Sequence, residues 1–193
     1  MTSPVPTVAE TSRSPRQVIE ALIGLLLGMF VSMLASTVVS TSLPVIVHDL
    51  SGDQAAYTWV VTATLLTTAI STPVWGKLAA LMNRKVLFQV SILIFVLATA
   101  AAGFSQNPGM LIAFRAVQGL GAGGLAALSQ VIMADIISPR ERGRYMGLFG
   151  AVMAVATVGG PLLGGVITDA WGWRWNFFVA LPFAVAALFI VQR

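Results

Sequence analysis

Six long apolar stretches follow one another along this chain of 193 residues, and they constrain its fold more than any other feature. A helix of about 20 apolar residues is long enough to cross the hydrocarbon core of a bilayer. Only 9% of the residues are charged, whereas a soluble domain carries roughly 25%. The sequence therefore predicts an all-α integral membrane protein with six transmembrane helices, at Val18–Val47, Tyr57–Leu81, Val86–Phe104, Pro108–Ala134, Tyr145–Thr168 and Asn176–Val191.

Composition also divides the chain into two regions. Residues 1–17 are rich in Pro, Ser and Thr and are predicted to form a disordered cytoplasmic tail, and residues 18–193 are predicted to form one six-helix bundle. The apolar run from Ile19 to Val47 is too long for a signal peptide. Because the chain has no cysteine and a single histidine, His48, we expect no disulfide, no metal site and no cofactor. No catalytic motif is present, so we do not expect an enzyme.

The basic residues predict the orientation of the six spans. Lys and Arg gather in the short loops on the cytoplasmic side of a membrane protein. Nine of the eleven basic residues fall on one side of the predicted spans, Arg174 falls on the other side, and Arg115 lies within a span. Both termini are therefore predicted to be cytoplasmic. The net charge of +4 is spread over short loops, which argues against nucleic acid as a partner.

Two connections carry signals for the start of a helix. Asn107 precedes Pro108, which places a capping side chain before a proline at the first helical position. Ser138 and Glu141 have the spacing of a capping box. We expect a helix to begin after each of these two caps.

Arg115 is the charge that lies deepest in a predicted span, and no acidic residue occurs at comparable depth. A guanidinium stays charged in proteins, and its burial in hydrocarbon costs at least several kcal/mol. Arg115 is followed at helical spacings by Gln118, Ala122 and Ser129, which places all four near one face. That face is expected to line a wet cavity. The alternative is a structural Arg that pairs with a carbonyl or amide.

The connection between the second and third spans carries a further pattern, over residues 76–85. It resembles the G-x-L-a-D-r-x-G-r-K signature of the major facilitator superfamily, with Ala80 in place of the acid and Asn83 in place of the second glycine. The resemblance implies a cytoplasmic gating loop, whose residues here are Gly76, Lys77, Ala80, Arg84 and Lys85. Ala80 cannot make the contact that the family's Asp makes. A simple positive-inside anchor is the alternative interpretation of Arg84 and Lys85.

Two further spans resemble motifs of the same superfamily. Residues 111–123 look like its fourth-helix motif, which implies a role in proton coupling for Arg115 and Gln118. Residues 156–165 resemble its antiporter signature G-x-x-x-G-P-x-x-G-G, and the matching residues are Gly160, Pro161, Gly164 and Gly165. The alternative for this second segment is generic packing of small residues between helices.

The first span adds a resemblance to the fourteen-helix drug:proton antiporters, over residues 35–44, where Ala35 stands in place of the family's Asp. Small or polar positions on the first, second and fourth spans are candidates for a substrate cavity, although serines that pack helices are an equal alternative for the first span. These candidates are Ser36, Ser40, Thr64, Thr68, Ala122 and Ser129. The tryptophans of the segment 171–178 are expected to form an interfacial aromatic belt.

Together these resemblances imply one half of a major facilitator fold, the N-terminal six-helix half of a drug:proton antiporter in a bacterial inner membrane. The implied activity is efflux of amphipathic or cationic drug-like molecules by proton-coupled antiport with alternating access. The implied partners are membrane lipid, a drug-like substrate, protons and a second six-helix bundle. The alternative is a six-helix membrane module that does not transport by itself, either an excised fragment or a subunit that must pair with a second bundle.

Overall fold

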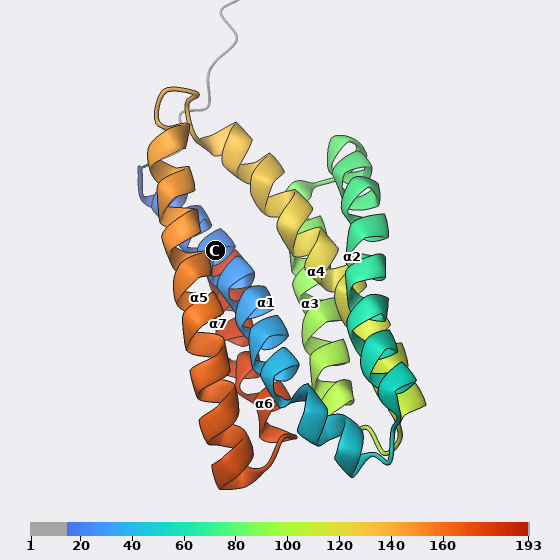
Figure 1. The fold of residues 1–193 in the computed structure, drawn as a ribbon. Coiled ribbons are helices and arrows are strands. Elements are labelled where there is room, and N and C mark those ends of the chain that lie inside the picture. Colours follow the sequence, from blue (N-terminus) through green and yellow to red (C-terminus); the bar gives the residue numbers. More distant parts are fainter. Residues whose placement is uncertain (1–14, 193) are drawn as a thin grey trace, which may run out of the picture.

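The computed structural model describes residues 15–192, which form seven helices and no strand (Figure 1). The prediction of an all-α protein is therefore confirmed. The predicted tail lies outside the described residues up to residue 14, and the first helix begins at Pro15, three residues before the expected boundary. The helices are α1 (Pro15–Asp49), α2 (Gln54–Leu81), α3 (Arg84–Gly103), α4 (Pro108–Ile136), α5 (Arg142–Trp171), α6 (Trp175–Phe178) and α7 (Ala180–Gln192).

Length and composition make four helices of the described part able to cross a membrane, namely α1, α3, α4 and α5. The 28 residues of α2 are enough for a span, but six of them are threonine, which lowers its hydropathy. The last predicted span corresponds to a shorter apolar segment, Trp175–Val191. Five predicted spans thus match single helices, and the sixth differs.

The sixth predicted span is divided into α6 and α7, which meet at Val179. The backbone of Val179 is helical, with φ −59° and ψ −34°. Pro182 follows in the next turn and has no N–H to donate to the carbonyl of Phe178. The missing hydrogen bond weakens the helix at this point.

Of the two predicted helix starts, one is confirmed and one is wrong. The side chain of Asn107 accepts a hydrogen bond of 2.9 Å from the N–H of Met110 and caps α4. The Ser138 hydroxyl instead bonds the carboxylate of Glu141, at 3.2 Å. The N–H groups of Glu141 and Arg142 both donate to the Ser138 carbonyl. Residues 138–141 therefore form a turn, and α5 begins only at Arg142.

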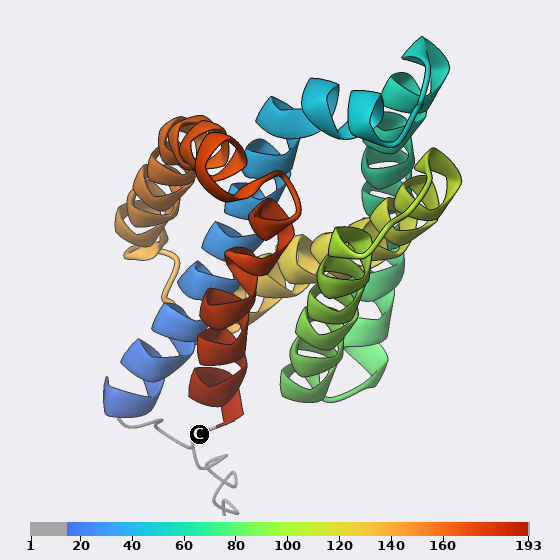
Figure 2. The same cartoon turned by 90° about the horizontal axis from the view of Figure 1, so that it is seen from below.

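The helices pack as two groups that lie side by side (Figures 1 and 2). One group consists of α2, α3 and α4, and the other of α1, α5 and α7. The groups join where α1 meets α4 and where α3 meets α6 and α7. A cluster of buried apolar side chains fills this junction, including Leu25, Phe88, Leu125, Leu128 and Ala187.

The two ends of the bundle differ in chemistry. We call the end with the α2–α3 and α4–α5 connections, which carry Arg84, Lys85 and Arg140, the basic end. The other end, with the α1–α2, α3–α4 and α5–α6 connections, is called the aromatic end because it carries Trp171, Trp173 and Trp175. The first start and the last end of the described helices both lie at the basic end (Figure 1).

The expected aromatic belt is wrong for one of its tryptophans. Trp171 and Trp175 are exposed, but Trp173 is buried and its indole N–H donates to Asp49 at 2.8 Å. The guanidinium of Arg174 stacks on Trp173 at 4.3 Å and donates to the carbonyls of Gly103 and Ser105. This segment therefore ties α1 and the end of α3 to α6, because a guanidinium satisfies carbonyls that the helix leaves unpaired.

Candidate functional site

The site forms around α4, which is enclosed on two sides. A Cβ at Gly119 would meet the Thr64 carbonyl of α2 at 2.5 Å, and a Cβ at Gly121 would meet the backbone of Phe95 in α3 at 2.6 Å. The two neighbouring helices can approach this closely only because α4 has no side chain at these positions. As a result, α4 holds its polar residues inside the bundle, where Arg115 is only 3% exposed.

Arg115 begins a chain of buried hydrogen bonds that links α4 to α3. Its guanidinium donates to the Gln118 carbonyl oxygen Oε1 at 2.6 Å. The Gln118 amide donates to the Thr99 hydroxyl at 2.7 Å, and that hydroxyl donates to the Phe95 carbonyl at 2.6 Å. Gln118 and Thr99 are almost completely buried. The chain fixes the orientation of the Gln118 amide and places the positive charge of Arg115 at its start.

A central cavity of about 170 Å³ lies beside this chain. We call it the central cavity; its walls come from α1, α2, α3, α4 and α5. Six predicted site residues line it, namely Ser36, Thr64, Thr68, Arg115, Gln118 and Ala122. Ser40 and Ser129 are not among its lining residues. Ser40 is exposed and donates to the Ser36 carbonyl, and Ser129 is buried with no partner for its hydroxyl among the described residues.

The apolar part of the cavity wall was not predicted from the sequence. Met29, Met33, Phe95 and Met153 also line it, but apolar residues in an apolar span carry no signal that separates them from their neighbours. Thr99 was missed as well. It is the one hydroxyl in the run from Ala98 to Ala102, which was a usable signal because an isolated polar residue in an apolar run normally finds a partner.

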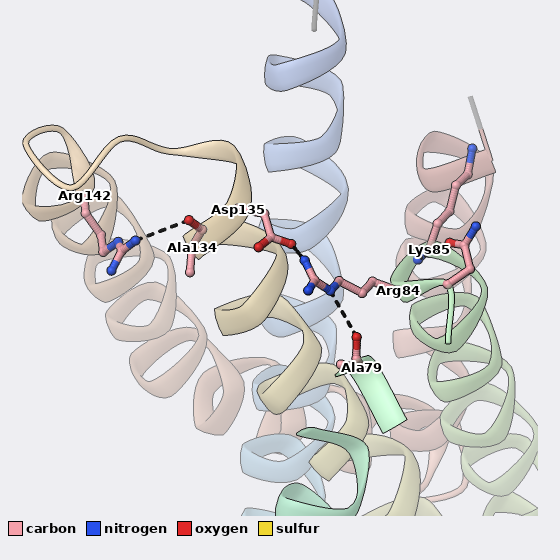
Figure 3. A network of polar contacts seen from close by, with 7 residues as sticks. Ala79, Arg84, Lys85, Ala134, Asp135 and Arg142 are labelled. Carbon is pink, nitrogen blue, oxygen red and sulfur yellow. Dashed lines mark hydrogen bonds and ion pairs between the residues drawn. The ribbon is translucent and has the colours of Figure 1, made fainter. Parts of the chain in front are cut away.

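The basic end carries an ion pair that was not predicted. Arg84 pairs with Asp135 at the end of α4, and its Nε donates to the Ala79 carbonyl at 3.1 Å (Figure 3). Arg84 therefore joins the end of α2 to the end of α4. A larger cavity of about 780 Å³ lies here, and Ala80, Lys85 and Glu20 line it together with the ion pair. Lys77 is exposed, and a Cβ at Gly76 would meet nothing within 4 Å.

The residues of the predicted antiporter motif divide between two faces of α5. Gly160 and Gly164 pack against Thr37 and Val38 of α1, and Gly164 leaves room for the Val38 carbonyl. Pro161 is exposed and does not end the helix, and a Cβ at Gly165 would meet nothing within 4 Å.

The described residues contain no cluster of acidic and histidine side chains that could hold a metal ion.

Comparisons with known proteins agree with this architecture. The sequence pattern of the Major Facilitator Superfamily matches residues 25–193. The multidrug transporter protein MdtP of Bacillus subtilis is 37% identical over 79% of this chain, and the efflux pump dotC of Dothistroma septosporum is 43% identical over 84% of it. The chain spans 28% of the length of each of these two relatives.

Solved structures show the same fold. The proton:xylose symporter XylE superposes with a TM-score of 0.81 at 13% identity, over 93% of this chain and 45% of that one. A bacterial homologue of the human lysosomal transporter Spinster, solved in an inward-facing state, gives a TM-score of 0.76 at 17% identity, over 93% of this chain and 43% of that one. The chain therefore belongs to the major facilitator superfamily, a family of transporters rather than of enzymes.

Proposed function

We propose that this chain is the N-terminal half of an exporter that moves drug-like amphipathic molecules out of the cell in exchange for protons. The observation that carries the proposal is a central cavity beside a buried positive charge, Arg115, in a helical bundle of which four described helices are long and apolar enough to cross a membrane. Transporters built from repeated bundles bind their substrates near the membrane midplane between the bundles. The names of the relatives, a multidrug transporter and an efflux pump, support export as the direction.

In this proposal, Arg115 and Gln118 take part in coupling but do not carry the proton. An arginine does not deprotonate in proteins, so it cannot release a proton. Its role is to change the protonation of a carboxyl group that comes close to it. Such a group would come from the second bundle or from the substrate, because the acidic residues of the described bundle lie near helix ends or in connections.

The proposal includes a second six-helix bundle and a fixed orientation. On the side that faces away from the bundle, α5 carries large exposed apolar residues such as Val155, Val158 and Leu162. A second bundle or lipid would cover these side chains. The basic end would face the cytoplasm, with both termini there, as the positive-inside rule predicts. A bacterial inner membrane is part of the proposal and is supported by the resemblance to drug:proton antiporters; the relatives come from both bacteria and fungi.

The test is transport in proteoliposomes with an imposed pH gradient. The 193-residue chain is reconstituted alone and together with the C-terminal bundle of a relative, and the movement of a cationic, a neutral and an acidic dye is followed. We expect gradient-driven movement of at least one dye only when both bundles are present. Dye movement that does not depend on the pH gradient would contradict proton coupling. No movement with both bundles would favour the non-transporting module.

The role of Arg115 is tested in the same system. We expect Arg115→Ala to abolish gradient-driven movement while folded protein falls far less. Arg144→Ala is the matched control, because Arg144 is an exposed arginine in the first turn of α5 and does not line the central cavity. Equal losses of folded protein and transport in Arg115→Ala would indicate a structural arginine instead.

A further inference from the structure

The guanidinium of Arg115 has donors that the bundle does not use. An arginine carries five N–H donors, and among the described residues only Gln118 accepts a hydrogen bond from this one. The Nε atom is buried and has no partner there. Arg115 also lines the central cavity, so a molecule bound there would lie beside this residue. An unpaired buried charge favours a ligand that brings acceptors.

No carboxylate of the described bundle neutralises this charge. The residues that line the central cavity supply hydroxyl, amide, thioether, aromatic and aliphatic groups, and Arg115 is the only charged one among them. The acidic residues of the described part lie at helix ends or in connections; they are Glu20, Asp49, Asp53, Asp135, Glu141 and Asp169. The central cavity is therefore positive and lined largely by apolar groups.

We infer that the central cavity selects amphipathic molecules that carry a carboxylate over those that carry an ammonium group. This inference rests on the proposed function and narrows the expected amphipathic or cationic substrates to acids. A carboxylate accepts two parallel N–H bonds from a guanidinium, which gives both strength and orientation. A cation in the same place meets a like charge at low dielectric, where the repulsion is poorly screened.

The rest of the wall suits the apolar part of such a molecule. Met29, Met33 and Met153 line the cavity together with Phe95. Methionine side chains are flexible and polarizable, so they adapt to apolar groups of different shape. The volume of about 170 Å³ is smaller than the range of about 300–1,000 Å³ for drug-sized ligands. This bundle therefore receives the carboxylate end of the substrate and not the whole molecule.

The test compares three probes of similar shape and different charge: 2-naphthoate, 2-naphthamide and 2-naphthylmethylammonium. Their binding to the 193-residue chain in lipid nanodiscs is measured by calorimetry, with empty nanodiscs as the reference for partition into lipid. We expect naphthoate to bind at least tenfold more tightly than the ammonium probe, which corresponds to about 1.4 kcal/mol. The neutral amide should fall between them.

Two variants connect the preference to Arg115. Arg115→Gln removes the charge and should reduce the preference to less than about twofold. Ser36→Asp leaves Arg115 in place and adds a carboxylate to the same wall, which neutralises the positive charge, so it should also reduce the preference to less than about twofold. The helix content of each variant is checked by circular dichroism. If Arg115→Gln does not fold, Ser36→Asp alone tests whether the preference depends on the positive charge of the cavity.

Three results would overturn the inference: equal binding of naphthoate and the ammonium probe, no binding of any probe, or a tenfold preference that survives Arg115→Gln. A preference for naphthoate that both variants change as expected supports it. The binding measurement needs no proton gradient and no second bundle. If the binding preference is intact but no proton-driven transport occurs, the result contradicts the proposed function and leaves this inference standing.

Discussion

Helices α4 and α5 are nearly equal in length and both rich in glycine, yet they are packed in different ways. In the most apolar 18-residue stretch of each helix, 56% of the residues of α4 are buried but only 17% of those of α5. The glycines of α4 from Gly119 to Gly124 all lie against α2 or α3, whereas α5 packs against α1 through Gly160 and Gly164. Five other glycines of α5 have open space where a Cβ would stand; they are Gly143, Gly147, Gly150, Gly159 and Gly165.

This difference shows that glycine has two separate uses in the same bundle. On α4 it lets three helices meet closely around the site. On α5, glycine allows close packing against α1 on one face only. The other face is apolar and carries glycines that contact nothing in the described bundle. In the proposed transporter, this open glycine-containing face of α5 can approach a second bundle, since small residues let helices come close. The two helices can be distinguished by substitutions that add a single methyl group.

The largest effect is expected for Gly119→Ala in α4. The added Cβ would contact Thr67 and the Thr64 carbonyl of α2, and α4 cannot move away because α3 packs on it at Gly121 and Gly124. Overpacking of this kind costs about 1–3 kcal/mol, and we expect the upper end. The measurement is the mole fraction of SDS at which helix content is lost in mixed micelles. A stability equal to the unaltered chain would show that α4 is not enclosed as described.

A smaller loss is expected for Gly164→Ala in α5, with Gly165→Ala as its neighbour and control. A Cβ at Gly164 would meet the Val38 carbonyl at 2.8 Å, but the opposite side of α5 is open, so the helix can shift outward. We expect a loss of about 1 kcal/mol, at the low end of the overpacking range. Gly165→Ala should leave stability unchanged or raise it by up to about 1 kcal/mol, because alanine is the better helix former.

The same pair of variants tests the proposed second bundle. If the open face of α5 packs against that bundle, Gly165→Ala should reduce association of the two bundles while the chain itself stays stable. Association can be followed by energy transfer between labelled bundles in a bilayer. Equal behaviour of Gly164→Ala and Gly165→Ala in both measurements would remove the distinction between the two faces of α5.

Much of the fold could be predicted because apolar length and helix caps are local properties. The five long helices and the cap at Asn107 follow from residues that act within a few positions of one another. The turn at Ser138 could not be predicted, because its hydroxyl has two possible partners within three residues and the sequence does not rank them. The break at Val179 could not be predicted from Pro182 alone, because Pro44, Pro73 and Pro161 lie inside helices that continue.

The site was predictable where polarity stands out and not where contact across helices decides. Arg115 and Gln118 are conspicuous in an apolar span, and they do lie beside a cavity. Ser40 and Ser129 also fit helical spacings from their neighbours, but Ser40 is exposed and Ser129 is buried outside the cavity wall. Trp173 looked interfacial by composition, and its partner Asp49 lies 124 positions away, beyond any local pattern.

The smallest effect is expected at the basic end, where an ion pair links the end of α4 to the start of α3. Arg84 and Asp135 are 41% and 37% exposed, and an ion pair at such exposure contributes about 0–1 kcal/mol. Asp135→Asn should therefore lower stability by no more than about 1 kcal/mol. It should also remove the salt dependence that screening of this pair gives the unaltered chain. Glu141→Gln is the matched control, because Glu141 is also exposed but, among the described residues, its carboxylate bonds only the neutral hydroxyl of Ser138. A salt dependence that persists in Asp135→Asn would show that other charges cause it and that this ion pair does not anchor α4.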